Sequence, residues 1–301
     1  MNESSQISLF PIDDVIAHQA RNKLVSGKWN AEKVINPINS QQDEIDYKKI
    51  SAESRRFLDA VLIFFFAGDS VVEHLILSFI PRITSKSRLS YEFQKLANED
   101  IHDEVYSRLL LIFKTPEEIK KCSEEIQSYD FVKKKIDWCV KTLEENFDFA
   151  MICMEGIFFS SSFCSIYWFK EQGLFPCVAE ANRYIARDEG FHTDVGIYFL
   201  KNKPPEKIAH VLIREAVEIE KAFINEFCPT EKGMSPKLLC EHVESIADNL
   251  LISMKYTPFY NIQSPFPFMG KFGTEVKFDF FGLKPDEYQA FVKEPFKRKD
   301  F

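Results

Sequence analysis

Two acidic residues stand alone inside long apolar stretches, and they limit how this chain can fold. Asp69 lies within the sequence IFFFAGDSVV, and Glu155 lies within MICMEGIFF. Segments this apolar belong in a packed core, where a lone carboxylate is costly unless a cation or a hydrogen-bond donor neutralises it. The fold must therefore bring compensating groups to both acids.

The composition favours an all-α fold. Only 10 of the 301 residues are glycine, whereas 30 are phenylalanine. Scarce glycine and abundant large aromatic side chains favour long, closely packed helices over a turn-rich β architecture. The stretch 150–169 approaches the length of a membrane span, but it contains Glu155 and three consecutive serines. We therefore expect a buried core helix there.

Proline, glycine and helix-capping residues divide the chain into segments. Helices are expected over residues 12–25, 53–79, 89–113, 131–143, 149–170 and 178–200, with two more that start at a Thr115 capping box and at Ser235. The polar stretch 36–46 is expected to be an irregular arm. The chain then has three parts: an N-terminal helix and arm (1–50), a helical bundle (51–257), and an irregular C-terminal segment with a tail (258–301).

Charge and cysteine usage narrow the class of protein. A net charge of −8 without a basic stripe argues against nucleic acid as a partner. The seven cysteines form no Cys-x-x-Cys pair and lie mostly in apolar runs, as reduced thiols of an intracellular protein do. The first residues have no secretory signal pattern. We expect a cytoplasmic protein that binds neither nucleic acid nor membrane.

Two histidines form a repeated motif. Of the six histidines, only His102 and His192 have a glutamate three positions earlier, at Glu99 and Glu189. On a helix this spacing places the carboxylate and the imidazole on one face, so both point to the same place. Each Glu-x-x-His pair can therefore supply half of a metal site.

The two lone acids complete a di-metal ligand set. Four carboxylates and two imidazoles suit two divalent ions, and this pattern is typical of ferritin-like di-metal proteins. A single Glu-x-x-His is more often a solvated pair, and a lone acid often bonds the backbone or an arginine. The alternation of acid and motif, with similar intervals from Asp69 to Glu99 and from Glu155 to Glu189, is hard to obtain by chance. We expect a ferritin-like helical bundle with a di-metal carboxylate site in its core.

Four stretches resemble the small subunit of class I ribonucleotide reductase, and the resemblance runs from about residue 9 to residue 301. They are KWNAEKV (28–34), EDIHDEVY (99–106), EGIFFSSSF (155–163) and RDEGFH (187–192). The resemblance implies two iron ions per chain, one held by Asp69, Glu99 and His102 and the other by Glu155, Glu189 and His192. Manganese suits the same ligands, so the sequence leaves the choice of metal open.

The resemblance also implies that Tyr106 carries a stable radical. Tyr106 lies four residues after His102, one helical turn along the same face. Phe159, Phe163 and Ile185 match the apolar pocket that surrounds this ring in the family. Without the fixed offset from His102, a tyrosine packed in the core would be the simpler interpretation.

A route for the radical is implied as well. Trp29 and Asp188 match a tryptophan and an aspartate that connect the iron-bound histidine, here His102, to the surface. A carboxylate that orients a metal-bound imidazole is a general device, so Asp188 has an independent rationale. Trp29 has none beyond the resemblance. Tyr288 corresponds to the tail tyrosine that passes the radical to the large subunit.

The tail is expected to bind that large subunit. Phe291, Phe296 and Phe301 recur at five-residue intervals in a stretch with too little apolar periodicity to fold alone. An aromatic anchor with a charged rim is a common way to bind a partner. The alternative is a charged terminus without a role. The resemblance further implies a small-subunit dimer, and the sequence leaves homodimer and heterodimer open.

Several departures from the family keep other functions open. Asp103 follows the first histidine where the family usually has serine, Ser70 follows Asp69 where glycine is usual, and the final residues are basic. A structural or chaperone-like paralogue that assists a second small subunit is one alternative. A stand-alone di-iron oxidase or iron-storage protein is another, but it leaves Trp29, Tyr288 and Phe301 without a role.

Overall fold

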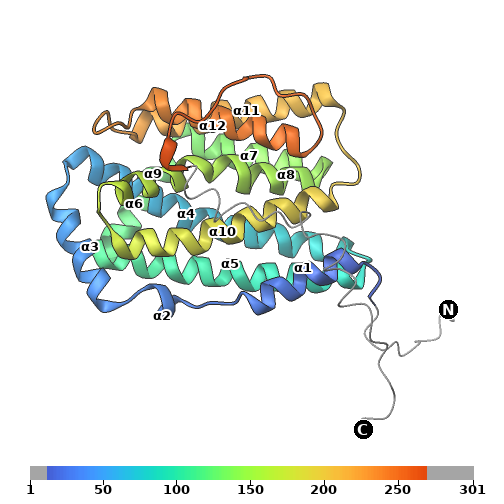
Figure 1. The fold of residues 1–301 in the computed structure, drawn as a ribbon, viewed down its shortest axis with the longest axis horizontal. Coiled ribbons are helices and arrows are strands. Elements are labelled where there is room, and N and C mark those ends of the chain that lie inside the picture. The colour runs from blue at the N-terminus through green and yellow to red at the C-terminus, as the bar shows by residue number, and fades with distance from the viewer. Residues whose placement is uncertain (1–11, 270–301) are drawn as a thin grey trace, which may run out of the picture.

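The computed structural model describes residues 12–269, apart from the side chains of Asp69 and Ser70, and this part of the chain is a helical bundle (Figure 1). Its elements are α1 (Val15–Ser26), α2 (Ala31–Val34), α3 (Pro37–Lys49), α4 (Ala52–Phe79), the 3₁₀ turn η1 (Ile80–Arg82), α5 (Lys86–Phe113), α6 (Pro116–Ser128), α7 (Asp130–Glu145), α8 (Phe147–Cys153), the π segment η2 (Met154–Phe158), α9 (Ser160–Glu171), α10 (Pro176–Phe199), α11 (Glu206–Phe227) and α12 (Pro236–Ser253). No strand occurs in this range beyond a single bridge between Glu231 and Met234. The predicted all-α fold is confirmed.

The helix α10 packs on several other elements. In Figure 1, α10 crosses the middle of the molecule, with α5 and α1 on one side and α7, α8, α11 and α12 on the other. It packs on α3, α5, α8, α9 and η2, while α4 and α1 pack along α5. The helices α1, α2 and α3 therefore pack on the bundle through α5 and α10. The helix α11 is absent from the helices predicted above, although its buried Leu212, Ala216 and Phe223 follow a helical period.

Several predicted helix boundaries agree with the observed caps. Thr115 and Glu118 form the capping box at the start of α6, and Ser235 caps α12 by accepting the backbone N–H of Leu238. Ser85 caps α5 in the same way, so this helix begins at Lys86 rather than at the predicted residue 89. These side chains satisfy N–H groups that have no partner within their own helix.

The stretch predicted as one helix over residues 149–170 is helical, but it is not a single regular α-helix. The chain forms α8, then the π segment η2, then α9, and Glu155 lies within η2. A π segment takes one extra residue into a helix and changes where its side chains point, which apolar periodicity does not reveal. Gly156, beside Glu155, allows a close approach of α12, because a Cβ there would lie 2.7 Å from Leu250 Cδ1 and the Leu250 side chain would have to shift.

The irregular arm predicted over residues 36–46 is also wrong. Asn36 caps a regular helix, α3, and Pro37 occupies its first turn. The buried residues of α3 are two acids, Asp43 and Asp46, rather than apolar side chains. A search for apolar periodicity therefore misses this helix.

The two buried acids of α3 fix the start of α10. Asp43 accepts hydrogen bonds from the backbone N–H groups of Cys177 (3.0 Å) and Val178 (2.9 Å), and Asp46 accepts one from Phe175 (3.2 Å). The N-terminal residue of α10 supplies no side-chain cap of its own. Because α10 carries Asp188, Glu189 and His192, α3 helps to set the position of the candidate site.

Two helical stretches, Ala52–Arg82 and Phe147–Glu171, are long and apolar enough to cross a membrane by length and composition alone. In the second, 94% of the apolar window is buried inside the protein, as predicted for a core helix over residues 150–169. In the first, 44% of the window is buried. Core helices of helical bundles meet the same criterion of length and hydropathy.

Replacing Asp43 with alanine is expected to lower the free energy of unfolding by about 2–4 kcal/mol, because two buried N–H groups lose their acceptor. Asp43→Asn keeps one acceptor oxygen and should lose roughly half as much. Chemical unfolding followed by circular dichroism measures both changes. Equal stability of the alanine variant and the unchanged protein would contradict the capping role.

Candidate metal centre

The two Glu-x-x-His pairs face each other in the core. Glu99 and His102 come from α5, Glu189 and His192 come from α10, and all four are buried. His102 Nδ1 lies 3.2 Å from Glu99 Oε2 and 3.0 Å from Glu189 Oε1. His192 Nδ1 lies 3.1 Å from Glu99 Oε1 and 3.6 Å from Glu189 Oε2. Each imidazole therefore contacts carboxylates from both helices.

The π segment adds a third carboxylate. One ligand atom each from Glu99, Glu155, Glu189 and His192 can be chosen so that all four lie within 4.8 Å of one another. His102 borders this group through its contacts with Glu99 and Glu189. Asp69, the fourth acid singled out in the sequence, lies in α4, but its side chain is outside the described part of the structure.

The donor atoms of this cluster suit a metal ion. Within residues 12–269, both oxygens of Glu189, both ring nitrogens of His192, Oε1 of Glu99 and Oε2 of Glu155 lack a partner with hydrogen-bond geometry. Buried polar atoms almost always have one. Carboxylate oxygens and imidazole nitrogens are common ligands of divalent iron and manganese. The cluster is therefore a candidate metal centre.

The charged groups of the cluster shift one another's pKa values. Burial acts to lower the pKa of His192, but Glu99 and Glu189 outweigh burial and raise this pKa to about 10. Burial acts to raise the pKa of Glu99, but His192 and His102 outweigh burial and hold this pKa below its ordinary value. Burial raises the pKa of Glu155 to about 8. A bound metal would displace protons from such groups, since metal ligands must be deprotonated.

A lysine that the sequence analysis did not consider also reaches the centre. Lys95 of α5 is only 4% exposed, and its Nζ lies 2.5 Å from Glu155 Oε1. Burial acts to lower the pKa of Lys95, but Glu155 and Glu99 outweigh burial and raise this pKa above its ordinary value. Lys95 stands four residues before Glu99, on the same face of α5, and this spacing is the signal that could have revealed it.

Asp188 connects Trp29 to His102, as the resemblance implies. Its Oδ2 accepts hydrogen bonds from Trp29 Nε1 (2.6 Å) and Asn98 Nδ2 (2.8 Å) and lies 3.6 Å from His102 Nε2. Arg187 bonds the other oxygen at 2.8 Å. The Trp29 ring also stacks on His102, with 5.9 Å between ring centroids. Sequence reasoning missed Asn98 and Arg187, which complete the surroundings of this carboxylate.

Tyr106 is fully buried in an aromatic cluster. Its ring stacks on Phe65 at 4.7 Å between centroids, and Phe65 in turn contacts Phe163 (4.8 Å) and Phe159 (5.5 Å). Ile185 is buried on α10. Phe65 was not singled out in the sequence, although it lies one helical turn before Asp69 on α4.

Tyr288 and the tail residues Phe291, Phe296 and Phe301 lie outside the described residues.

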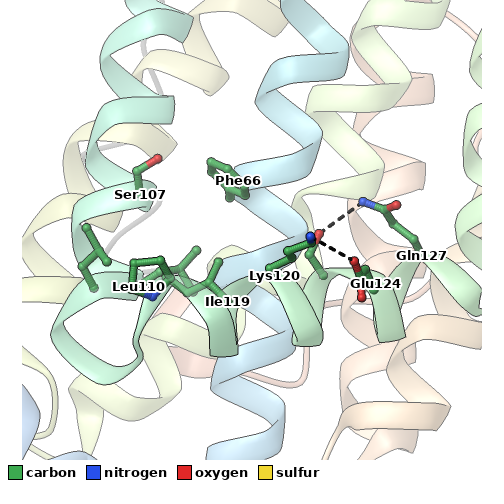
Figure 2. Close-up of a pocket in the computed structure, with 10 residues that line it drawn as sticks. Phe66, Ser107, Leu110, Ile119, Lys120, Glu124 and Gln127 are labelled. Carbon is green, nitrogen blue, oxygen red and sulfur yellow. Dashed lines mark hydrogen bonds and ion pairs between the residues drawn. The ribbon is translucent and has the colours of Figure 1, made fainter.

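The centre is enclosed rather than open to a substrate. A groove of about 530 Å³ lies at the surface, lined by residues of α4, α5 and α6 that include Phe66, Leu110 and Lys120. Figure 2 shows these lining residues. None of the residues proposed for the centre lines it. A cavity that His192 and Lys95 do line has only about 10 Å³, room for at most one water molecule.

Solved structures share this fold. A ribonucleotide reductase homodimer from Saccharomyces cerevisiae matches with a TM-score of 0.78 and 29% sequence identity, over 95% of this chain and 91% of that one. The dimanganese(II) NrdF protein of Streptococcus sanguinis matches with a TM-score of 0.79 over 91% of this chain and 100% of that one. Its identity of 17% supports the fold alone.

Sequence comparisons agree with the structural ones. The small chain of ribonucleoside-diphosphate reductase from Schizosaccharomyces pombe is 35% identical over 93% of this chain and 74% of its own length. Human ribonucleoside-diphosphate reductase subunit M2 is 34% identical over the same shares of the two chains. Residues 6–267 match the family described as "Ribonucleotide reductase, small chain". This chain therefore belongs to the small-chain family of ribonucleotide reductases.

Proposed function

We propose that this chain is the radical-generating small subunit of a ribonucleotide reductase. It would form a tyrosyl radical at Tyr106 and lend it to a large subunit that reduces ribonucleoside diphosphates to deoxyribonucleotides. The observation that carries this proposal is the contact of Trp29 with Asp188, and of Asp188 with His102, beside the buried cluster. An iron-storage protein or a stand-alone oxidase has no need of such a connection.

The proposed metal ligands are the buried residues of the cluster whose donor atoms lack a hydrogen-bond partner, together with Asp69, which the sequence pattern adds. Glu99 and His102, with Asp69, would hold one ion, and Glu155, Glu189 and His192 would hold the other. Iron is the proposed metal, and manganese suits the same ligands. When bound, the metal pair would supply, with oxygen and an external reductant, the oxidising power that removes one electron and one proton from Tyr106.

The surroundings of Tyr106 favour a long-lived radical. The ring is fully buried and stacks on Phe65, and Phe159 and Phe163 enclose the other sides of Phe65. These apolar rings keep water and small reductants away from the phenol. The protein thus supplies protection and position, while the metal supplies the oxidation.

Asp188 would couple Trp29 to the centre. As Trp29 gives up an electron, the carboxylate that accepts its indole N–H can hold that proton, because the hydrogen bond is already formed at 2.6 Å. Arg187 and Asn98 fix the same carboxylate, so its contact with His102 is kept. Groups of this kind orient a metal-bound imidazole and tune its basicity.

A nucleotide cannot bind at the enclosed centre itself. A cavity of about 10 Å³ cannot admit a nucleotide, so substrate must bind elsewhere. We propose that the large subunit holds it and that the tail, with Tyr288, Phe291, Phe296 and Phe301, binds that subunit. A small-subunit dimer, homomeric or heteromeric, and a cytoplasmic location without nucleic-acid or membrane partners complete the proposal.

One observation favours a second candidate function. The ion pair of Lys95 with Glu155 places a fixed positive charge where a metal would bind. A structural paralogue that assists a second, active small subunit would tolerate this charge better than an enzyme would. Electron paramagnetic resonance on the chain reconstituted with ferrous iron and oxygen separates the two functions, since only the active subunit gives a tyrosyl signal.

Glu189→Gln should weaken metal binding by at least about 10- to 100-fold, the loss seen when a group that merely supports a metal ligand is removed. The variant keeps the volume of Glu189 but loses its charge between His102 and His192. Metal analysis after dialysis against a weak chelator measures the change. Glu220→Gln is the control, because Glu220 is equally buried but pairs with Lys135. Unchanged metal content in Glu189→Gln would exclude that residue as a ligand.

Tyr106→Phe should abolish the tyrosyl signal while bound metal stays the same, because only a hydroxyl group is removed. The free energy of unfolding should change by no more than about 1–2 kcal/mol. Electron paramagnetic resonance and metal analysis on one sample provide both readouts. Tyr91→Phe, at another buried tyrosine of α5, is the control that should keep the signal. A signal that survives in Tyr106→Phe would assign the radical to another residue.

Trp29→Phe should leave the metal and the Tyr106 radical in place but reduce turnover with the large subunit to background, because the N–H donated to Asp188 is lost. Trp138→Phe serves as a control, since Trp138 is buried and donates its N–H to the Leu212 carbonyl. Nucleotide reduction assays on both variants test the route. Normal turnover of Trp29→Phe would rule it out.

A further inference from the structure

The contact between Lys95 and Glu155 joins two elements at the metal centre. Lys95 projects from α5 and Glu155 from the π segment, and each side chain is 5% exposed or less. The Nζ atom of Lys95 contacts one oxygen of the Glu155 carboxylate, Oε1, at 2.5 Å. The other oxygen, Oε2, has no hydrogen-bond partner within the described part of the chain and belongs to the cluster of free donor atoms.

The charge of the centre then favours one divalent ion over two. Three described carboxylates, from Glu99, Glu155 and Glu189, against one ammonium leave two negative charges, which a single divalent ion balances. Two divalent ions would leave an excess of positive charge, even with Asp69 counted from the sequence. Uncompensated charge in a buried place is costly.

The ammonium also has little room to withdraw. A divalent ion on Oε2 of Glu155 would face Lys95 across one carboxylate, and repulsion is poorly screened in a protein interior. The adjoining cavity of about 10 Å³ has space for a single small group. Glu92, the other acid beside Lys95, lies 3.4 Å from Arg88, but Arg88 also pairs with Asp148, so these three groups together keep one negative charge.

We propose that Lys95 acts as a tethered cation at the metal centre, so that the chain binds one metal ion tightly and the ion beside Glu155 much more weakly. Lys95 is then a positioning residue that determines how many ions the centre holds. This inference rests on the proposed function only in that the cluster must bind metal. It holds for an active subunit and for a structural paralogue alike.

Manganese(II) titration of the full-length, metal-free protein tests the proposal. Manganese(II) is a suitable probe because it stays divalent and its free form is counted directly by electron paramagnetic resonance. The unchanged protein should show two affinities at least about 100-fold apart, and Lys95→Met should strengthen the weaker one by about tenfold or more, a typical effect of groups next to metal ligands. The tight site should change little.

Three further variants make the test specific. Lys95→Gln, which also lacks the charge, should repeat the effect of Lys95→Met and guards against poor folding of one variant. Lys95→Arg keeps the charge and should bind metal as the unchanged protein does. Lys135→Met removes the other buried lysine, which pairs with Glu220 at 2.6 Å away from the cluster, and should leave both affinities unchanged. Circular dichroism confirms that each variant is folded.

The outcomes separate this inference from the proposed function. Two ions bound with the same affinities in the unchanged protein, Lys95→Met and Lys95→Gln would overturn the inference and leave the di-metal proposal intact. The absence of bound manganese from every folded variant would overturn both. A stronger second site in the two neutral variants alone would support the tethered cation.

Discussion

Negative charge enclosed in the helical core is the constraint on which the rest of this structure depends. Three carboxylates from two helices and a π segment meet where water is excluded, and each would be costly without compensation. Two imidazoles and one ammonium supply positive charge around them. The helices that carry these groups all pack on α10 or include it, so the fold and the centre are held by the same contacts.

The described part of the chain contains two buried lysine–glutamate pairs, and the groups that surround them differ. Lys135 and Glu220 are enclosed by the rings of Phe64 and Phe223, and Ser161 donates a hydrogen bond to Glu220. Both oxygens of Glu220 are contacted there, one by Ser161 and one by Lys135 at 2.6 Å, although the Lys135 contact lacks hydrogen-bond geometry. The pair links α7 to α11. In the pair at the centre, by contrast, Glu155 keeps a free oxygen among other free donors. A divalent ion bound there would satisfy it.

Much of the centre could be predicted because helical spacing alone determines which side chains share a face. The two Glu-x-x-His pairs converge for this reason, and the family resemblance supplied the positions of Trp29 and Asp188. The π segment around Glu155 could not be predicted, since an inserted residue leaves no mark on apolar periodicity. Lys95 escaped notice because a lysine is normally solvated, and α3 escaped because its buried face is acidic. The place of the Asp69 side chain stays a prediction.

Trp29 and its partner Asp188 lie in parts of the chain that differ in local stability. Trp29 lies in the short non-helical stretch between α1 and α2, whereas its partner Asp188 lies within the long helix α10. Short connections open locally at a lower free energy than the helices of a core, and amide hydrogen exchange reveals such openings. A transient opening at this stretch would separate Trp29 from Asp188 while the side chains of the buried cluster stayed assembled. The proposed route through Trp29 would then be interrupted without any unfolding of the bundle.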